Sequence, residues 1–418
     1  MIESLAALSL TAWIYLCFCQ GRFWTTSERL EDGAPEPDSW PEVVAIVPAR
    51  DEEDVIESSI GSLLRQAYAG RFTVILADDE SQDRTAERAS MLEGSDSRLE
   101  ICRTPERPAG WVGKMWAVHT GVLHAQEHHP GATYLLLTDA DIEHSPGNLA
   151  ALVRRAERDR LDLTSLMVKL DASHGWSRLL IPSFVYFFSQ LYPFARVNNP
   201  TARTAGAAGG CMLVRREALD RIGGMETLKS EVIDDCAMGR ALKAQGPIWL
   251  GHTTSEKSIR PYTGLGEIWS MVARSAYTQL DYRPVFAAGT LAGLSLLFVI
   301  PVLAVILGLV TGQSETALLG LSAWTLMAAT FLPTLALYHR GPVASLWALT
   351  LPLAGILYGA MTLDSVRRHM SGRGAEWKGR VGAGAAEART MGLDDANHPS
   401  PTQPPARPPE GPRRPEGE

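Results

Sequence analysis

Four short clusters of acidic residues are the parts of this sequence best suited to chemistry. They are PARDEE at residues 48–53, ADDESQD at 77–83, TDADIE at 138–143 and VIDD at 232–235. In the third cluster, Asp139 and Asp141 stand at positions i and i+2, so both carboxylates can face one hard cation. Mg²⁺ or Mn²⁺ is commonly held by one or two carboxylates, with diphosphate and water completing the shell. The alternative is a solvated turn in which Asp141 or Ser145 caps the next helix.

The other clusters each allow a binding or catalytic role and a structural one. Asp78 and Asp79 can accept hydrogen bonds from a nucleobase imide or a ribose hydroxyl. Alternatively, Asp83 or Ser81 simply caps the next helix, with Asp79 in a turn. Arg50 can face a phosphate or pair with these acids. A carboxylate at 234 or 235 can take a proton from an attacking hydroxyl, or the pair can complement a helix macrodipole.

One lysine stands where an anion could bind. Lys114 follows GWVG at the expected start of a helix over 115–125. A helix amino terminus preceded by glycines is a ready anion site, and the ammonium group would add a point charge for a diphosphate or a sugar. The alternative is an ordinary surface lysine.

An α/β domain is needed to bring these residues together. Short apolar runs alternate with amphipathic stretches between about residues 41 and 251. The expected strands are 42–48, 72–77 and 134–138, and the expected helices are 51–67, 83–93 and 147–158. In an open parallel sheet, ligands gather beyond the carboxyl ends of the strands. Since an acidic cluster follows each expected strand, we predict one charged cleft at that edge.

Four apolar stretches predict membrane helices, because roughly 20 apolar residues cross a core of about 30 Å. The first runs from about residue 5 to 18 or 23 and is expected to be an uncleaved anchor; the others are about 285–310, 317–337 and 343–363. A buried soluble bundle is the alternative for the last three. The expected organisation is an anchor (1–24), a linker (25–41), a catalytic domain (42–283), membrane helices (285–363) and a tail (364–418), first basic and then Pro-rich and disordered.

Basic residues near the helix ends predict a cytoplasmic catalytic domain. Arg22 follows the first apolar stretch and Arg283 precedes the second. Three further crossings would place the basic run from Arg367 to Arg380 outside, which conflicts with the same rule. Either one segment is re-entrant or the anchor does not fully cross, and the side of the carboxyl terminus stays open. The aromatic stretch 176–197 is expected to seat the cleft on the membrane surface; a core helix or a lid is the alternative.

The composition limits the kinds of partner that the chain is expected to bind. The chain has 39 Lys and Arg against 47 Asp and Glu, for a net charge of −8. This acidic balance offers no broad footprint for nucleic acid, so we expect none to bind. The five cysteines are scattered, without the spacing of a zinc site, so we expect reduced thiols and no structural metal.

The acidic clusters, in their order, resemble the family 2 nucleotide-sugar glycosyltransferases with the GT-A fold. The resemblance lies in VPARDEE, ADDESQDRT, TDADIE and VIDDCAMGRAL and covers about residues 42–280. One anchor followed by a carboxyl-terminal helix bundle is similar to the ceramide glucosyltransferase-like branch. Within that branch, GWVGKMWAV and RSAYTQLDYRP resemble the bacterial hopene-associated glycosyltransferases.

The resemblance implies a role for each candidate residue. Asp139 and Asp141 match the DxD motif that holds Mg²⁺ or Mn²⁺, and Asp235 matches the catalytic base. The residues implied in donor binding are Pro48, Arg50, Glu52, Asp78, Asp79, Lys114, Asp139 and Arg274. Arg274 matches the (Q/R)xxRW arginine only in part, because Met271 and Ser275 replace the expected Gln or Arg and Trp. This departure disfavours a processive polysaccharide synthase.

The expected function is therefore an inverting glycosyltransferase in a bacterial-type inner membrane. It would transfer a sugar from a nucleoside diphosphate, expected to be UDP, to a lipid hydroxyl such as that of a hopanoid, at the cytoplasmic face. The alternatives are a polysaccharide synthase, a polyprenyl-phosphate sugar transferase, and an inactive membrane scaffold that keeps the fold.

Overall fold

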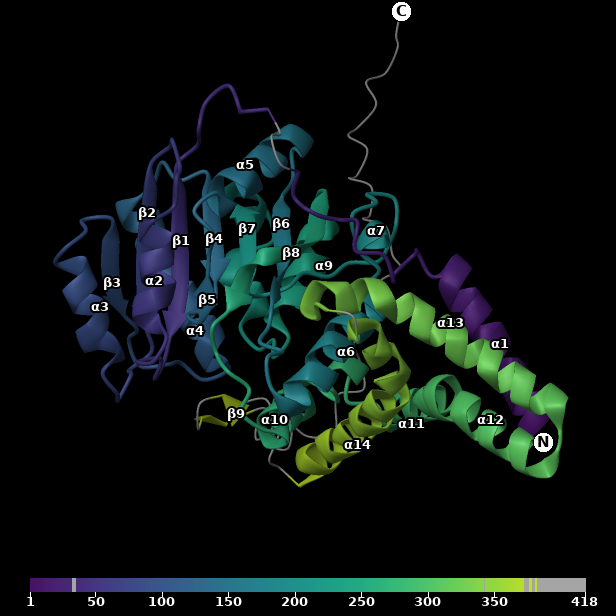
Figure 1. Ribbon diagram of the computed structural model, residues 1–418. Coiled ribbons are helices and arrows are strands. Elements are labelled where there is room, and N and C mark those ends of the chain that lie inside the picture. The colour runs from purple at the N-terminus through teal and green to yellow at the C-terminus, as the bar shows by residue number, and fades with distance from the viewer. Residues whose placement is uncertain (32–34, 342, 372–375, 378–379, 382–418) are drawn as a thin grey trace, which may run out of the picture.

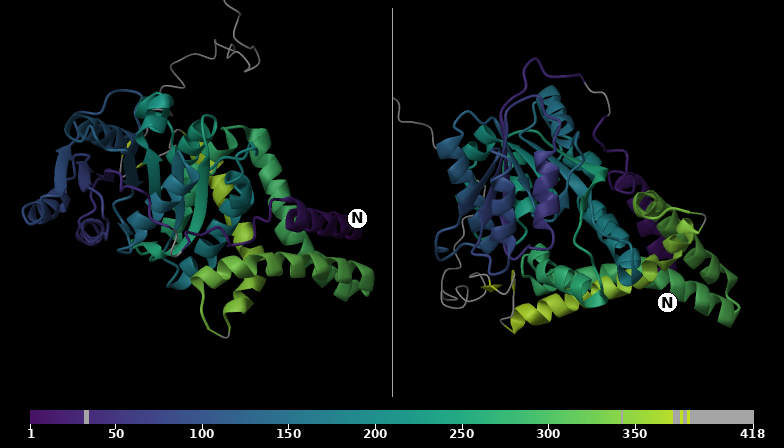
Figure 2. Two further views of the ribbon diagram at one scale, coloured as in Figure 1. Left: turned by 90° about the horizontal axis from the view of Figure 1, so that it is seen from above. Right: turned by 60° about the vertical axis from the view of Figure 1, so that its left-hand side comes forward.

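The protein is described by a computed structural model for residues 1–31, 35–341, 343–371, 376–377 and 380–381. A mixed α/β domain occupies one side of the molecule, and long apolar helices extend from the other (Figure 1). Both views in Figure 2 show the chain's amino terminus far from the sheet, at the outer end of the helical part. The tail from residue 382, expected to be disordered, lies outside the described residues.

The α/β domain is built on an eight-stranded sheet in the order β3-β2-β1-β4-β7-β6-β8-β5. The strands are β1 (Val43–Ala49), β2 (Phe72–Asp78), β3 (Leu99–Arg103), β4 (Tyr134–Thr138), β5 (Ile142–Glu143), β6 (Leu163–Lys169), β7 (Cys211–Arg215) and β8 (Ile248–Ser258). Strands β3, β2, β1 and β4 run parallel, and so do β6 and β8. β7 is antiparallel to both of its neighbours, and β5 is antiparallel to β8. The expected α/β fold with a mostly parallel sheet is confirmed.

Helices cover both faces of this sheet, which explains why its central strands are apolar throughout. Every residue of β1 is buried. One face packs against α4 (Gly113–His128) and α9 (Asp234–Lys243), and the other against α2 (Ile56–Leu64) and α5 (Asn148–Asp159). Gly121 allows α4 to lie close to β1, because a Cβ there would be 2.5 Å from a methyl carbon of Ile46. The carboxyl ends of β1, β2 and β4 therefore meet at one fixed edge.

The expected helix over 51–67 is wrong at its start. In the structure, residues 51–55 form a turn before α2, and the backbone of this turn is hydrogen-bonded to side chains of the next loop. α3 (Thr85–Glu93) likewise begins two residues later than expected. By contrast, the strand over 134–138 and the end of the helix near 158 lie within one residue of their expected positions.

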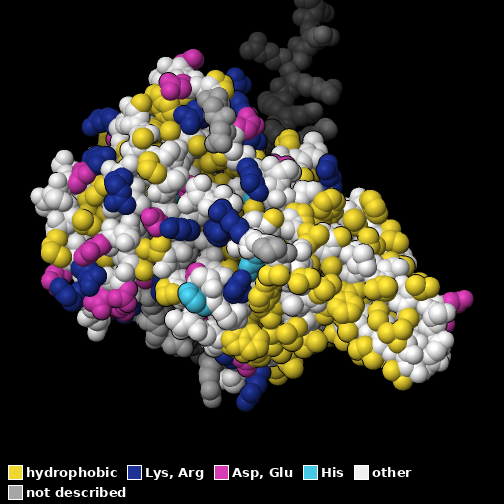
Figure 3. Space-filling view, in the orientation of Figure 1, with side chains coloured by type: hydrophobic (Ala, Val, Ile, Leu, Met, Phe, Trp, Pro, Cys, Tyr) yellow, Lys and Arg dark blue, Asp and Glu magenta, His cyan; other side chains and the backbone are white. Residues whose placement is uncertain are grey.

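Four helical stretches are long and apolar enough to cross a membrane: Ile2–Cys19, Pro284–Thr311, Ser314–Tyr338 and Ala344–Met370. They comprise α1 (Ile2–Cys19), α11 (Pro284–Leu294), a π-helical turn (Ser295–Val299), α12 (Ile300–Thr311), α13 (Ser314–Tyr338), the 3₁₀ turn η4 (Ala344–Thr350) and α14 (Leu351–Met370). Figure 3 shows the apolar side chains gathered over this part of the surface. The molecule thus has the apolar surface of a membrane-associated protein.

The aromatic stretch expected at the membrane surface forms α6 (Gly175–Leu191), followed by the short α7 (Phe194–Val197). α6 packs against α13, α14 and α10 (Leu265–Ser275). The Tyr186 side chain is fully buried, and its hydroxyl lies 2.7 Å from that of Thr330 in α13. This packing is that of a core helix, the alternative considered for the segment, although Trp176 and Leu191 at its two ends are exposed.

Candidate active site

The acidic clusters predicted to converge lie at the same edge of the sheet. Arg50–Glu53 follow β1, Asp78 ends β2 and Asp79 follows it, and Asp139 and Asp141 follow β4. Asp234 and Asp235 begin α9, which packs against the same face as α4. The clusters fall into two groups, one around the loops after β1 and β2 and one around Lys114.

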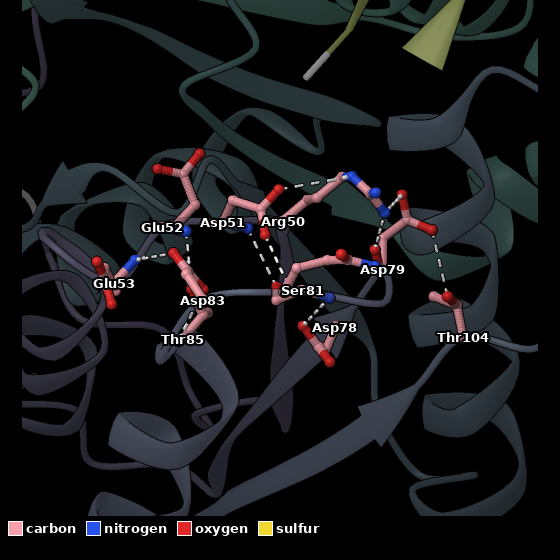
Figure 4. Close-up of polar contacts among 11 residues, drawn as sticks. Arg50, Asp51, Glu52, Glu53, Asp78, Asp79, Ser81, Asp83, Thr85 and Thr104 are labelled. Atoms are coloured by element: carbon pink, nitrogen blue, oxygen red, sulfur yellow. Dashed lines mark hydrogen bonds and ion pairs between the residues drawn. The ribbon is translucent and has the colours of Figure 1, made fainter. Parts of the chain in front are cut away.

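The loops after β1 and β2 are held together by backbone-to-side-chain hydrogen bonds (Figure 4). The Asp51 amide donates to Ser81 Oγ at 3.1 Å, and the Gln82 amide donates to Asp51 Oδ1 at 2.7 Å. The amide of the next residue, Glu52, donates to Thr85 Oγ1 at 2.7 Å. These reciprocal bonds make the two loops one rigid unit.

Asp79 lies at the centre of this unit with only 1% of its surface exposed. Its carboxylate lies 3.5 Å from an Arg50 guanidinium nitrogen and accepts a hydrogen bond from Thr104 Oγ1 at 3.3 Å. Of the two possibilities for Arg50, the structure therefore has it paired with the acids. Asp78 Oδ1 accepts from the Ser81 amide at 3.3 Å, which closes a turn after β2.

A pocket opens beside these residues. It is lined by Asp78, Glu80, Ser81, Ala86, Arg103 and Thr104. Carboxylate, hydroxyl and guanidinium groups in one polar hollow at a strand end can hydrogen-bond the imide edge of a base or the hydroxyls of a ribose. The geometry suits a nucleoside.

Lys114 joins two of the acidic clusters. Its Nζ lies 2.8 Å from Asp139 Oδ1 and 3.2 Å from Asp234 Oδ2. Burial lowers the pKa of Lys114, but the carboxylates of Asp139, Asp234 and Asp235 outweigh it, and the pKa is raised. Burial raises the pKa of Asp139 despite the neighbouring ammonium group. Lys114 thus lies between Asp139, which follows β4, and Asp234, which begins α9, rather than being an isolated surface lysine.

Asp235 lies beside this ion pair and is held by the backbone. Its Oδ2 accepts from the Gly209 amide at 2.9 Å, and its Oδ1 accepts from the Cys236 amide at 2.7 Å. Burial, and next the negative charge of Asp234, raise the pKa of Asp235 to about 6. A Cβ at position 209 would lie 3.5 Å from Asp235, so Gly209 packs directly against this carboxylate. A fixed carboxylate with this pKa is suited to accepting a proton near neutral pH.

A second pocket adjoins Lys114 and combines charged and apolar walls. Its residues are Pro48, Lys114, Met115, Val118, Leu137, Thr138, Asp139, Gly209, Met212, Met225, Asp234 and Met238. The predicted residues Pro48, Lys114 and Asp139 therefore share one pocket with Asp234. Gly209, which also lines this pocket, is the residue whose backbone amide donates to Asp235.

Arg260, which no sequence motif singles out, lies on the side of the site formed by Glu52 and Asp141. Its guanidinium group donates to both carboxylate oxygens of Glu52, at 2.5 and 2.7 Å, and to Asp141 Oδ2 at 3.3 Å. Ser258 Oγ also donates to Asp141, at 2.8 Å. Arg260 stands outside every recognised motif, just beyond β8, and it reaches Asp141 because β8 pairs with β5. Only that long-range strand pairing could have revealed it.

The carboxylates after β4 fit a divalent cation by their chemistry. Asp139 and Asp141 are hard oxygen ligands whose side chains are 35% and 15% exposed. Among the described residues, no group of three or more His, Cys, Asp or Glu side chains is arranged to hold a metal. A site with two carboxylates is what Mg²⁺ or Mn²⁺ uses when a diphosphate and water supply the remaining ligands.

Arg274, in contrast, is not among the residues that line either pocket. It lies exposed in the last turn of α10, and its charge acts on Tyr262. Tyr262 lies between Asp141 and the apolar helices, because it packs against the hydrophobic core of those helices. Its hydroxyl donates to Met271 Sδ at 3.3 Å. Burial, and next the charge of Asp141, raise the pKa of Tyr262 to about 12.

Comparison with known proteins is consistent with this geometry. Residues 44–223 match the sequence family described as Glycosyl transferase family 2. The uncharacterized protein y4gI of Sinorhizobium fredii is 26% identical over 222 residues, which make up 48% of this chain but only 23% of that relative.

Two solved structures extend the comparison. The mannosyltransferase PcManGT from Pyrobaculum calidifontis, solved with GDP-Man and Mn²⁺, has a TM-score of 0.50 and 17% identity, covering 89% of this chain and 98% of its own. Glucosyl-3-phosphoglycerate synthase from Mycobacterium tuberculosis, solved with Mn²⁺, UDP and glucosyl-3-phosphoglycerate, has a TM-score of 0.40 and 18% identity, covering 58% and 80%. The first likeness shows the fold. Residues 44–223 are therefore similar in sequence to the family 2 glycosyltransferases, and the structure has the GT-A fold.

Proposed function

We propose that this enzyme transfers a sugar, with inversion, from a nucleoside diphosphate to the hydroxyl group of a membrane lipid. The observation that carries the proposal is the placement of Asp235: a backbone-held carboxylate with a pKa near 6 lies beside Lys114 and Asp139, the residues suited to a diphosphate. Residues 42–283 would form the catalytic domain, with residues 1–24 and 285–363 in the membrane.

The donor would lie across both groups of acids. The pocket beside Asp78 and Thr104 would hold the nucleoside, and we take UDP as the first candidate, because the resemblance of the acidic clusters to the nucleotide-sugar glycosyltransferases led us to expect it. Lys114, at the amino terminus of α4, would face the diphosphate. Asp139 and Asp141 would hold Mg²⁺ or Mn²⁺, which would neutralise charge on the leaving diphosphate.

Asp235 would then act as the general base. It would remove the proton from the acceptor hydroxyl as the oxygen attacks the anomeric carbon, in line with the departing diphosphate. The two backbone amides fix its orientation. A single carboxylate in this role implies a direct displacement, so the anomeric configuration would invert.

Two short chains of contacts support a lipid acceptor, because they join the acids to the apolar helices. Asp141 contacts Arg260, and Tyr262, two residues further on, packs in the core of the helical part. From Asp235, the adjacent Cys236 lies against Tyr192, whose hydroxyl accepts from Gln279 Nε2 at 2.7 Å. Gln279 precedes α11 by five residues. The catalytic groups thus lie next to the surface where a lipid headgroup would arrive.

Incubating the purified enzyme with Mn²⁺, a panel of UDP- and GDP-sugars and a total membrane lipid extract would test this proposal. A sugar found by mass spectrometry on a neutral lipid alcohol would support it. Because GWVGKMWAV and RSAYTQLDYRP resemble the hopene-associated enzymes, a hopanoid is the first pure acceptor to add. Label found only on a polyprenyl phosphate or on a polysaccharide would replace the proposed acceptor, and consumption of no donor would refute the proposal.

A further inference from the structure

Basic residues stand at only some of the ends of the apolar helical stretches. Residues 1–21, 284–339 and 341–366 contain no Lys or Arg. Arg22, Arg283, Arg340 and Arg367 stand at the edges of these stretches. The opposite ends, at the amino terminus and at the turn between α12 and α13, carry only acidic charges such as Glu3 and Glu315. By the positive-inside rule, all four arginines belong on the side of the catalytic domain.

The segment after α13 begins on that side. His339 follows α13, and its Nε2 lies 2.9 Å from the carbonyl oxygen of Arg178, near the start of α6. Trp347 in η4 stacks on His339 and lies against the Arg178 guanidinium group. The five steps of chain from 339 to 344 extend at most about 18 Å, which is less than the roughly 30 Å of a hydrocarbon core. η4 therefore cannot start on the opposite face.

α14 then returns to the side where η4 began. Gly355 packs against Phe298, and further along, Gly359 faces Leu291. At the end of α14, Ser365 Oγ accepts from the Tyr277 amide at 3.0 Å. As the residue numbers increase along α14, the residue numbers of its contact partners decrease, from 298 to 291 to 277. α14 therefore runs antiparallel to α11 and ends beside the residues that precede α11.

Other contacts fix the same end of α14 to the catalytic domain. The Trp269 indole in α10 donates to Asp364 Oδ2 at 2.8 Å, and His369 stacks on Tyr282 with 4.4 Å between ring centres. α12, which forms the outer half of the long helix over 284–311, packs mainly against α13 and α1. In Figure 1, α14 lies beside α10 and α11, whereas α12 and α13 extend beyond it toward the amino terminus.

We infer that η4 and α14 form a re-entrant hairpin, so that the chain crosses the bilayer three times, through α1, the helix over 284–311, and α13. The inference rests on the membrane location in the proposed function. It places the amino terminus opposite the catalytic domain and residue 371 on the same side as that domain. It also resolves the conflict in the basic-residue count, because Arg367 and Arg368 then lie inside.

The hairpin would contact lipid in only one leaflet, the one that faces the catalytic domain. Its exposed large apolar side chains there include Leu346, Leu349, Leu353, Ile356 and Leu363. Protein at membrane depth that enters and leaves by one face is tolerated where neighbouring helices cover it. Half of the most apolar 18-residue part of Ala344–Met370 is buried against the rest of the chain. The acceptor leaflet is thus the one that this hairpin enters.

Cysteine labelling of the full-length enzyme in membranes tests the topology. Ser314→Cys lies at the turn between α12 and α13, and Ser371→Cys lies just after α14; both positions are exposed. A membrane-impermeant maleimide would be applied to intact cells and to inside-out vesicles, with the unaltered chain as the blank for its own five cysteines. Transfer activity would be measured in the same vesicles.

We expect Ser314→Cys to be labelled only in intact cells and Ser371→Cys only in inside-out vesicles. Labelling of both from the same face, in vesicles that still transfer sugar, would overturn the hairpin and leave the proposed function intact. Release of the protein by carbonate washing would remove the membrane location itself, and with it both proposals.

Discussion

The two groups of acids at the sheet edge are neutralised in different ways. Around Asp51 and Asp79, the carboxylates accept hydrogen bonds from a backbone amide and a hydroxyl and form an ion pair with the buried Arg50, so the two loops form a fixed frame. Around Asp139 and Asp234, the counter-charge is the ammonium group of a single lysine side chain, that of Lys114. A frame suits recognition of a nucleoside that does not change during the reaction. A single lysine ammonium group suits a site for a diphosphate and a metal, because the charge on the diphosphate changes as its bond to the sugar breaks.

Of the variants proposed, Asp235→Asn should cause the largest loss of activity. The amide cannot take the proton from the acceptor, so kcat should fall by about 10²- to 10⁴-fold, the usual contribution of a general base. Donor binding should be nearly unchanged, because Asp235 is held by its own backbone contacts rather than by the nucleoside frame. Single-turnover kinetics with a titration of UDP would measure both. Normal turnover would exclude Asp235 as the base.

Lys114→Met should weaken the diphosphate subsite without disturbing the frame. Hydrogen bonds to charged groups contribute about 1.5–3 kcal/mol, so affinity for the nucleoside diphosphate should fall about 10- to 100-fold. The affinity for the nucleoside alone should hold. The matched control is Lys229→Met, an exposed lysine in the turn that pairs with the start of α4. Equal losses for nucleoside and nucleoside diphosphate would contradict the division into two groups.

The pH profile should report the raised pKa of Asp235. The base acts when deprotonated, so kcat/KM should fall tenfold for each pH unit below about 6. Asp234→Asn removes the second cause of the raised pKa, and the acidic limb should therefore move to lower pH. An acidic limb that stays in place in Asp234→Asn would mean that a different group titrates.

The smallest expected effect is that of Arg260→Gln. Arg260 ties Glu52 in the frame to Asp141 after β4, but its side chain is 38% exposed, so the pair should contribute no more than about 1 kcal/mol. The KM for the donor should rise up to about fivefold, with kcat nearly constant. Arg158→Gln, a surface arginine paired with Glu31, is the control. A large loss of kcat would make Arg260 part of the reacting centre rather than a positioning residue.

The sequence predicted β1, β2 and β4, three of the eight strands of the sheet, and the acidic clusters that follow them, because these patterns are encoded locally. The strand over 134–138 is a buried apolar run with an acidic end, and its helix-covered neighbours show the same pattern. The helix over 51–67 was predicted too long, since Ser81, Asp83 and Thr85, distant in sequence, hold residues 51–53 in a turn. Arg260 could not be found, because it reaches Asp141 through the pairing of β8 with β5.

The pairing of Lys114 with both Asp139 and Asp234 shows the same limit. Each residue was singled out by its own local motif, but the motifs carry no information about mutual distance. The structure joins them because α4 and α9 pack on the same face of the sheet. Chemical type was therefore predictable from the sequence, whereas the pairing of charges depended on tertiary packing.

Titration of UDP with and without Mn²⁺, into the wild-type enzyme and into the double variant Asp139→Ala/Asp141→Ala, tests the central claim most directly. If the strand-end acids form one donor site, Mn²⁺ should tighten UDP binding to the wild type and should have no effect on the variant. Equal enhancement by Mn²⁺ in both proteins would contradict that claim.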